Sequence, residues 1–197
     1  MILDEVMPNS EHSVVAHAVV EADAATTWRA VHEANLFTDR TVRWLIALRD
    51  LPSFAWDRIR GRPAELVPPS ITFDDILQLE GWTLLGEEPR RELVAGSIGR
   101  FWERGYGWTD VAAEEFAGFS EPGFAKTVAG ISIRSYGDQR TLVSYESRTS
   151  TTSADAARQF GRYWFVLRPF VGLVMRRAVA AIRVEAERSS RTLAAAR

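Results

Sequence analysis

The segment Ala154–Ser189 reads ADAARQFGRYWFVLRPFVGLVMRRAVAAIRVEAERS and predicts one long α-helix with a continuous apolar stripe. The stripe residues recur at steps of three and four, which places them within about 50° of one line along a helix. They are Phe160, Trp164, Leu167, Val171, Val174, Ala178 and Ile182. The opposite side carries Arg158, Arg162, Arg176 and Arg183. A helix this long needs a broad apolar surface against its stripe, so we expect the upstream strands to form a sheet beneath it.

Pro169 interrupts this helical pattern. Because proline removes a backbone donor, we expect a bend near Phe165. A bent helix either follows a curved sheet or leaves volume beneath the bend. Phe165, Val166 and Leu173 fall off the apolar stripe. They are candidates for contact with upstream helices or with a second subunit, so a homodimer is one alternative.

Upstream of this helix the sequence alternates between strand and helix signals. The valine-rich run Ser13–Val20 predicts a first strand. Asp23 is a candidate N-cap for a short helix ending near residue 34, and a second short helix is expected over residues 38–48. Thr72 and Asp75 form the pattern of a capping box, which predicts another short helix over Phe73–Leu79.

Strand signals dominate the middle of the chain. Two hairpins are expected, with turns at residues 88–90 and 137–138. Their strands are predicted at Trp82–Glu87, Glu92–Trp102, Phe124–Tyr136 and Arg140–Ser150, and a further short strand at Phe116–Phe119. Strands in series beside segregated helices indicate the α+β class, with an antiparallel sheet.

Charged residues interrupt these strands at several positions. They are Glu92, Arg100, Arg134, Glu146 and Arg148. We expect an outer polar face, and any that points inward would be a buried charge in need of a partner or a ligand.

Composition limits the classes of protein to consider. The 197 residues fit a single domain, 1–197, with a core over about residues 13–189. The formal net charge of −2 gives no general attraction to nucleic acid or to an anionic membrane. Cysteine is absent, so disulfides and thiolate ligands are excluded. The longest apolar run near the C-terminus, Phe170–Met175, is far shorter than the roughly 20 residues of a membrane span, and we expect a cytoplasmic protein.

This order of elements resembles the helix-grip fold of the START-like superfamily, also called SRPBCC, which includes polyketide cyclases. Three pieces carry the resemblance over nearly the whole chain: Val19–Trp28, then Leu84–Pro89 leading to Gly96–Trp102, and Phe160–Phe165. The second piece is similar to uncharacterised bacterial members. The resemblance implies a curved antiparallel sheet wrapped around the long C-terminal helix, with two short helices after the first strand. It does not choose among carriers, cyclases, hydrolases and other members.

Catalytic signatures are scarce. No histidine pair has helical metal-ligand spacing and no phosphate-binding or Gly-x-Ser-x-Gly motif occurs, so we predict no metal, cofactor or nucleotide. His17, in the first strand, and Tyr145 are weak candidates for moving a proton. The alternative for His17 is a strand histidine bonded to a neighbour or to water.

Tryptophan suggests a ligand more strongly than the titratable residues do. The seven tryptophans offer rigid apolar walls, each with one directed N–H donor, although each alone is more often core than ligand contact. Trp108 lies among those near the sheet. The expected binding set is Trp82, Phe101, Trp102, Ile131, Tyr145, Trp164, Leu167 and Val171. The leading hypothesis is binding of a small hydrophobic molecule between sheet and helix; the alternatives are a cyclase- or hydrolase-like enzyme acting there and a cavity-free interaction domain.

Overall fold

The computed structural model describes residues 1–36, 72–103 and 105–195. The helices are α1 (Ile2–Val6), α2 (Ala24–Glu33), α4 (Phe73–Leu77), α5 (Ala113–Phe116) and α6 (Ala154–Ala195). The strands are β1 (His12–Val20), β2 (Trp82–Glu88), β3 (Glu92–Gly99), β4 (Ala125–Ser135) and β5 (Thr141–Thr151). The short helix expected over residues 38–48 lies outside the described residues.

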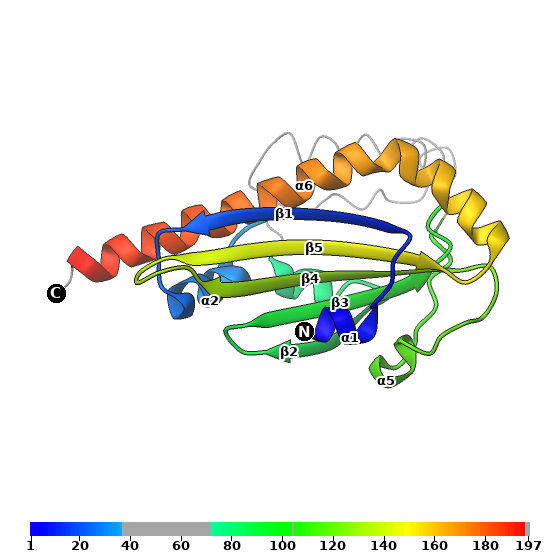
Figure 1. The fold of residues 1–197 in the computed structure, drawn as a ribbon, viewed down its shortest axis with the longest axis horizontal. Helices are drawn as coiled ribbons and strands as arrows, with labels where there is room; N and C mark the ends of the chain where they lie inside the picture. Colours follow the sequence, from blue (N-terminus) through cyan, green and yellow to red (C-terminus); the bar gives the residue numbers. More distant parts are fainter. Residues whose placement is uncertain (37–71, 104, 196–197) are drawn as a thin grey trace, which may run out of the picture.

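The five strands form one antiparallel sheet in the order β1-β5-β4-β3-β2. The helix α6 packs against β1, β5 and α2, and Figure 1 shows it running the length of the sheet above β1. This α+β arrangement is consistent with the helix-grip fold. The sheet is open, with β1 and β2 at its edges, and does not close around the helix.

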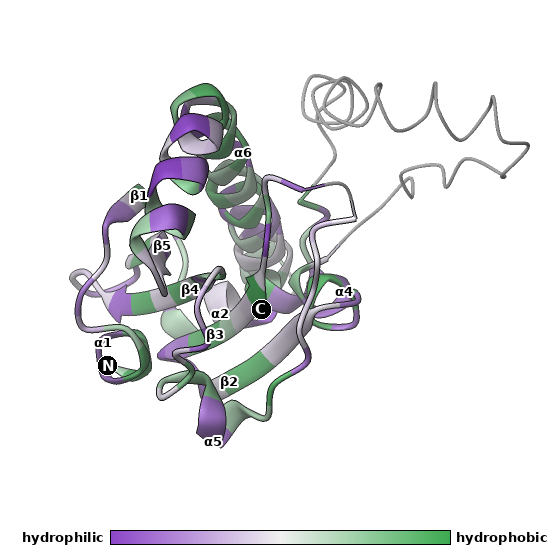
Figure 2. Ribbon diagram, turned by 90° about the vertical axis from the view of Figure 1, so that its right-hand side faces the viewer, coloured by the Kyte–Doolittle hydropathy of each residue, from purple (hydrophilic) through white to green (hydrophobic). Residues whose placement is uncertain are grey.

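Both faces of the sheet are covered, by different elements. The inner face meets α2, α4 and the C-terminal half of α6, around Trp28, Phe73 and Ile182. On the outer face, α1 and α5 contribute Leu3 and Phe116 to a second cluster. Figure 2 shows α1 on one side of the sheet and α4 and α6 on the other. Because β3 lies between these layers, all eight of its residues are buried, Glu92 included.

Local capping explains where the short helices begin. The carboxylate of Asp23 accepts a hydrogen bond from the Thr26 backbone N–H at 2.9 Å, and this bond lowers the pKa of Asp23. At α4, Thr72 accepts from the Asp75 N–H while Asp75 accepts from the Thr72 N–H, the reciprocal capping box that the sequence predicts. Both helix starts are therefore confirmed.

The outer layer holds the largest differences from expectation. Residues 116–119 do not form a strand, because the preceding Ala113, Glu114 and Glu115 begin the helical turn α5, and Phe116 completes it by packing into the outer cluster. The helix α1 was not anticipated. Its first N–H groups, of Ile2 and Leu3, donate to the buried carboxylate of Glu92 at 2.7 and 3.2 Å.

The burial of α6 changes along its length. Phe160, Ala178 and Ile182 of the predicted stripe are buried, whereas the stretch Trp164–Val171 is no more than half-buried. Beyond Pro169 the buried side includes Met175. Proline cannot continue the backbone ladder, so the helix bows there, and Figure 1 shows its first half arching away from β1.

Candidate functional site

A row of small side chains crosses the inner face of the sheet. Strand register places Leu84, Ala95, Ala129, Ser147 and Val14 side by side on β2, β3, β4, β5 and β1. Ala95 and Ala129 are buried, while Ser147 and Val14 keep part of their surface exposed. The row is therefore accessible at both ends, at Leu84 on β2 and at Ser147 and Val14 beneath α6.

Two further rows of residues lie on either side of the small-residue row. On one side Leu93, Ile131 and Tyr145 lie in register across β3, β4 and β5. On the other side the row carries hydroxyl groups, and the Thr127 and Thr149 hydroxyl oxygens lie 2.7 Å apart in a hydrogen bond. The inner face thus offers an apolar wall, a shallow centre and a polar wall.

Tyr145 is set deep in the inner face but remains partly accessible to solvent. Burial raises the pKa of its phenol to about 12, yet the residue keeps part of its surface accessible. Its ring packs edge-on against Phe73 at a centroid distance of 6.2 Å. Because the phenol is partly exposed, it is also partly hydrated, which limits the effect of burial. At neutral pH the phenol is protonated and can donate a hydrogen bond.

Two buried polar atoms in β3 and the turn that follows it have no hydrogen-bond partner in the described parts of the chain. They are the Ser97 hydroxyl on β3 and the indole N–H of Trp102. Ser97 lies in register with Trp82 and Thr127 on the inner face. Leaving such atoms unpaired costs about 1–3 kcal/mol each, so a ligand that pairs with them gains affinity.

Aromatic rings gather where β3 ends and α6 begins. Phe160 lies at the centre, stacked on Trp164 at 5.8 Å and edge-on to Trp102 and Phe101 at 6.4 and 6.3 Å. His12 packs against the same ring at 5.2 Å. This cluster brings three of the predicted binding residues together.

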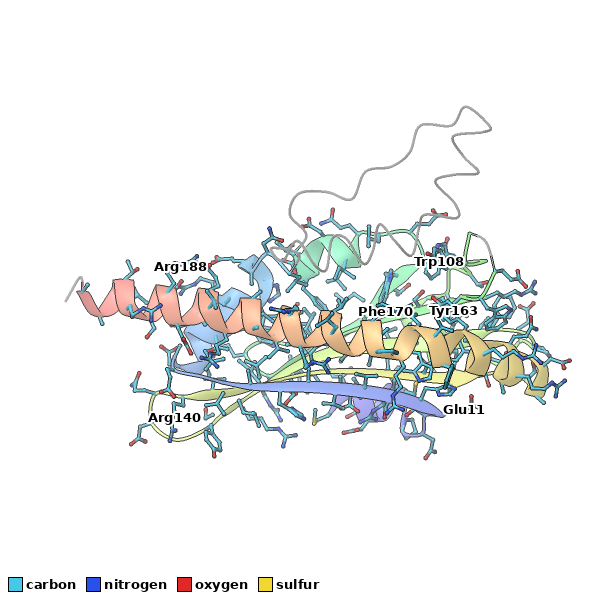
Figure 3. All side chains as sticks on the ribbon, turned by 90° about the horizontal axis from the view of Figure 1, so that it is seen from above. Glu11, Trp108, Arg140, Tyr163, Phe170 and Arg188 are labelled. Carbon is cyan, nitrogen blue, oxygen red and sulfur yellow. The ribbon has the colours of Figure 1, made fainter. Side chains whose placement is uncertain are left out.

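Trp108 and Tyr163 extend the aromatic cluster. The Trp108 ring packs edge-on to Phe101 at 5.5 Å, and that of Tyr163 lies 5.9 Å from Phe160. Figure 3 shows Tyr163 and Phe170 on the bowed half of α6, with Trp108 on the side away from β1.

The remaining predicted residues fall into other surroundings. Ile131, Tyr145 and Val171 belong to the inner core, Val171 and Tyr145 at its half-buried margin. Leu167 and Trp82 are half-buried outside the clusters. The expected set is thus divided between the inner core, the aromatic cluster and the accessible surface between them.

An open cleft of about 480 Å³ lies between β1 and the bow of α6. It is lined by Ser13, Val14 and Val15 of β1 and by Arg168, Pro169, Gly172 and Arg176 of α6. Val14 connects this cleft to the small-residue row, since it is the β1 member of that row. Sequence reasoning allowed for volume beneath the bend but included none of these lining residues in the predicted binding set, because the approach of β1 to the bow depends on tertiary packing.

His17 lies away from the inner face. Val14, Ala16 and Val20 point inward from β1, so His17 points to the outer face, where its Nδ1 lies 2.8 Å from the Ser144 hydroxyl oxygen. This is a strand histidine bonded to a neighbour, and its position removes it from any inner site.

A histidine–carboxylate contact joins α2, α4 and β2. The Nδ1 of His32 lies 2.8 Å from an Asp74 carboxylate oxygen, and its Nε2 lies 3.9 Å from Glu87. The capping box predicts that Asp74 is near a helix start, but no local signal pairs it with a residue 42 positions away. Within the described ranges, no group of three or more acidic, histidine or cysteine side chains could hold a metal. Those ranges also contain no helix that is both long and apolar enough to cross a membrane.

No protein-family model and no curated protein matches this chain. Among solved structures, CalU16 from Micromonospora echinospora is 16% identical, with 92% of this chain and 87% of that chain covered and a TM-score of 0.29. The Zhui aromatase/cyclase from Streptomyces sp. R1128 is 12% identical over 90% and 94%, with a TM-score of 0.32. TTHA0849 from Thermus thermophilus is 9% identical over 91% and 99%, with a TM-score of 0.36. The assignment of the fold rests on the element order and sheet topology described above.

Proposed function

We propose that this chain is a START-like binding module that holds a small hydrophobic molecule between the inner face of the sheet and the bowed part of α6. The proposal is supported by half-buried side chains on the inner face of the sheet and on α6. Tyr145, Ser147 and Val14 contribute from the sheet, and Trp164 and Val171 from the helix. Partly exposed apolar side chains beneath a helix gain free energy when a guest covers them, at about 25 cal/mol per Å² before ordering costs.

The polar groups at this site are few and directed. The protonated phenol of Tyr145 is one donor on the inner face. An apolar pocket with a small number of such groups is typical of ligand sites. We therefore expect the guest to carry at least one hydrogen-bond acceptor on an apolar or aromatic frame. We also propose the cytoplasmic location that the sequence predicts.

Binding is favoured over catalysis by the position of His17. The enzyme alternative needs two titratable groups that converge on one space. Of the two candidates, Tyr145 faces inward and His17 faces the opposite side of the sheet. Tyr145 alone can orient a ligand, which supports the binding hypothesis.

A filling substitution tests the site. Ser147→Leu adds bulk to an accessible end of the small-residue row, and we expect at least a fivefold loss of affinity for the neutral dye N-phenyl-1-naphthylamine. Ser144→Leu is the matched control, because Ser144 lies on the same strand but on the opposite face. Trp164→Ala should also weaken binding of the dye. Circular dichroism checks that each variant is folded, and unchanged dye affinity in a folded Ser147→Leu protein would contradict the site.

Native mass spectrometry of the purified protein identifies the natural guest class. We expect a co-purified apolar molecule of low mass, lost in the Ser147→Leu variant and retained in the Ser144→Leu variant.

A further inference from the structure

The bow of α6 exposes a group of large apolar side chains, here called the ridge and made up of Phe165, Val166, Pro169 and Phe170. Phe165 is 85% exposed, Val166 65% and Phe170 38%. Bulky apolar residues at this level of exposure in one turn of helix mark a surface that meets another apolar phase. None of the four ridge residues belongs to the aromatic cluster.

The charge around the ridge has one sign. Between Asp155 and Glu185 the chain contains six arginines and no acidic residue, although the formal net charge of the whole protein is −2. Arg158 and Arg183, near the ends of this segment, pair with Asp155 and Glu187. The segment is thus a local basic surface on an acidic protein.

Three arginines beside the ridge are available to a partner. Arg162, Arg168 and Arg176 are exposed, and they form no salt bridge within the described residues. Arg168 and Arg176 also border the cleft between α6 and β1. Guanidinium groups in such positions can each form paired hydrogen bonds to phosphate or carboxylate oxygens.

The charge pattern argues against a second copy of the chain as the occupant. A two-fold contact places the same patch against itself, so the arginines around one ridge would face those around the other. An anionic lipid surface instead complements both features, because headgroup phosphates attract arginine while the acyl boundary accepts aromatic side chains.

We propose that the ridge and its arginines dock this protein reversibly on an anionic phospholipid surface. Phe165, Val166 and Phe170 enter the boundary between headgroups and acyl chains, and Arg162, Arg168 and Arg176 contact the headgroups. The contact is peripheral and does not require a membrane-spanning helix. Phe165, Val166 and Phe170 belong neither to the inner core nor to the cleft lining, whereas Pro169, Arg168 and Arg176 also line the cleft.

Vesicle co-sedimentation tests this docking with two lipid compositions. We expect binding to phosphatidylcholine vesicles that contain about 30% phosphatidylserine, at least tenfold tighter than to phosphatidylcholine alone. At about 0.5 M NaCl the preference should largely disappear, because salt screens exposed charges. Equal binding to both compositions, or none to either, would overturn the proposal.

Matched variants separate the two components. Phe165→Ser combined with Phe170→Ser, and separately the triple change Arg162→Gln, Arg168→Gln and Arg176→Gln, should each weaken vesicle binding at least tenfold. The controls, Val184→Ser and Arg188→Gln, lie on the same helix beyond the segment and should bind as the native protein does. All these positions are exposed, so the variants should keep their fold. The variant with Phe165→Ser and Phe170→Ser should also keep its affinity for the neutral dye, because neither residue lines the cleft. Native-like vesicle binding by the folded ridge variants would contradict the proposed docking.

Depth of insertion can be read directly, because the chain contains no cysteine. Phe165→Cys carrying an NBD label should show a blue shift on anionic vesicles and quenching by doxyl groups on the acyl chains, whereas Leu193→Cys with the same label should show neither. Light scattering tests the alternative that a second copy of the chain binds at the ridge. A dimer that dissociates on Phe165→Ser, together with an unchanged label spectrum on vesicles, would reassign the ridge as a subunit interface.

Discussion

Glu92 shows how a single side chain connects two distant parts of the chain. Glu92 is 3% exposed, and its carboxylate accepts hydrogen bonds from the Ile2 and Leu3 N–H groups. These are first-turn donors that have no partner within α1, so the acid both caps the helix and offsets its partial positive charge.

Removal of the Glu92 side chain should therefore weaken the attachment of α1 to the sheet. We expect Glu92→Ala to lower the free energy of unfolding by about 2–3 kcal/mol, because it leaves two N–H groups unpaired under the outer layer. Glu88→Ala, which removes only an exposed ion pair with Arg91, should change it by less than about 0.5 kcal/mol. Urea denaturation measures both, and equal effects would contradict the capping role.

Tyr145 gives a pH dependence whose sign can be derived. Its pKa is raised from 10 to about 12 by burial, so the folded state holds the phenolic proton more tightly than the unfolded state does. That contribution to stability is complete below pH 10 and is lost as the pH rises towards 12. Allowing for partial exposure, we expect a loss of about 1 kcal/mol between pH 9 and pH 11.

The Tyr145→Phe variant should lack this alkaline loss. Urea denaturation at pH 9 and pH 11 gives the difference between native and variant protein at each pH. Tyr136→Phe is the control, because Tyr136 is 51% exposed. Parallel pH slopes for the native and Tyr145→Phe proteins would show that the phenol ionises as freely in the folded state as in the unfolded state.

At the scale of the element, two glycines have opposite tolerances. A Cβ built at Gly161 in α6 meets nothing within 4 Å, whereas one at Gly96 in β3 would lie 2.5 Å from Leu85 and 2.6 Å from Phe116. Glycine inside a helix costs about 0.5–1 kcal/mol relative to alanine, so Gly161→Ala should stabilise the protein by about that amount.

Gly96→Ala should instead destabilise the protein by about 1–3 kcal/mol, because α5 packs directly over β3 and the added methyl group overfills the contact. Thermal denaturation of both variants gives the comparison. A neutral Gly96→Ala change would mean that α5 shifts aside easily and that the outer cluster is loosely held.

For the whole molecule, the two covering layers predict a gradient of stability across the sheet. All eight residues of β3 are buried, and β3 pairs with β2 on one side and β4 on the other. The edge strand β2 pairs only with β3 and is mostly half-buried. Local openings start where fewest contacts must break.

Amide hydrogen exchange should therefore be slowest in β3 and β4 and measurably faster in β2. Exchange followed by mass spectrometry or NMR gives the protection of each strand. Protection of β2 equal to that of β3 would show that the sheet opens only as one unit.

Local signals predicted much of this fold because they act within a few residues. The caps at Asp23 and Thr72, the two hairpins and the periodicity of α6 all appear in the structure near their expected bounds. The short helices α1 and α5 were missed for the opposite reason. Neither has a side-chain cap from its own N-cap residue, and contacts with distant parts of the chain on the outer face of the sheet hold both.

The inner face was harder to predict than the elements that form it. Along β1, Val14, Ala16 and Val20 alternate with Val15, His17 and Val19, so both faces look apolar and the sequence leaves the direction of His17 open. The predicted binding set of aromatic and aliphatic residues stays a prediction. The structure divides it between the aromatic cluster, the inner core that holds Ile131, and the half-buried Leu167 and Trp82 outside both.

Short-range chemistry in the chain was sufficient to establish an antiparallel sheet, a long amphipathic helix and a proline that must bend it, because backbone geometry and periodicity depend on neighbouring residues. Packing between segments far apart in the chain decided three further features. These are the place where the bend stands away from β1, the burial of Glu92 under α1, and the cleft beside Arg168 and Arg176. Net charge likewise hid a basic surface, since composition averages over residues that folding separates in space.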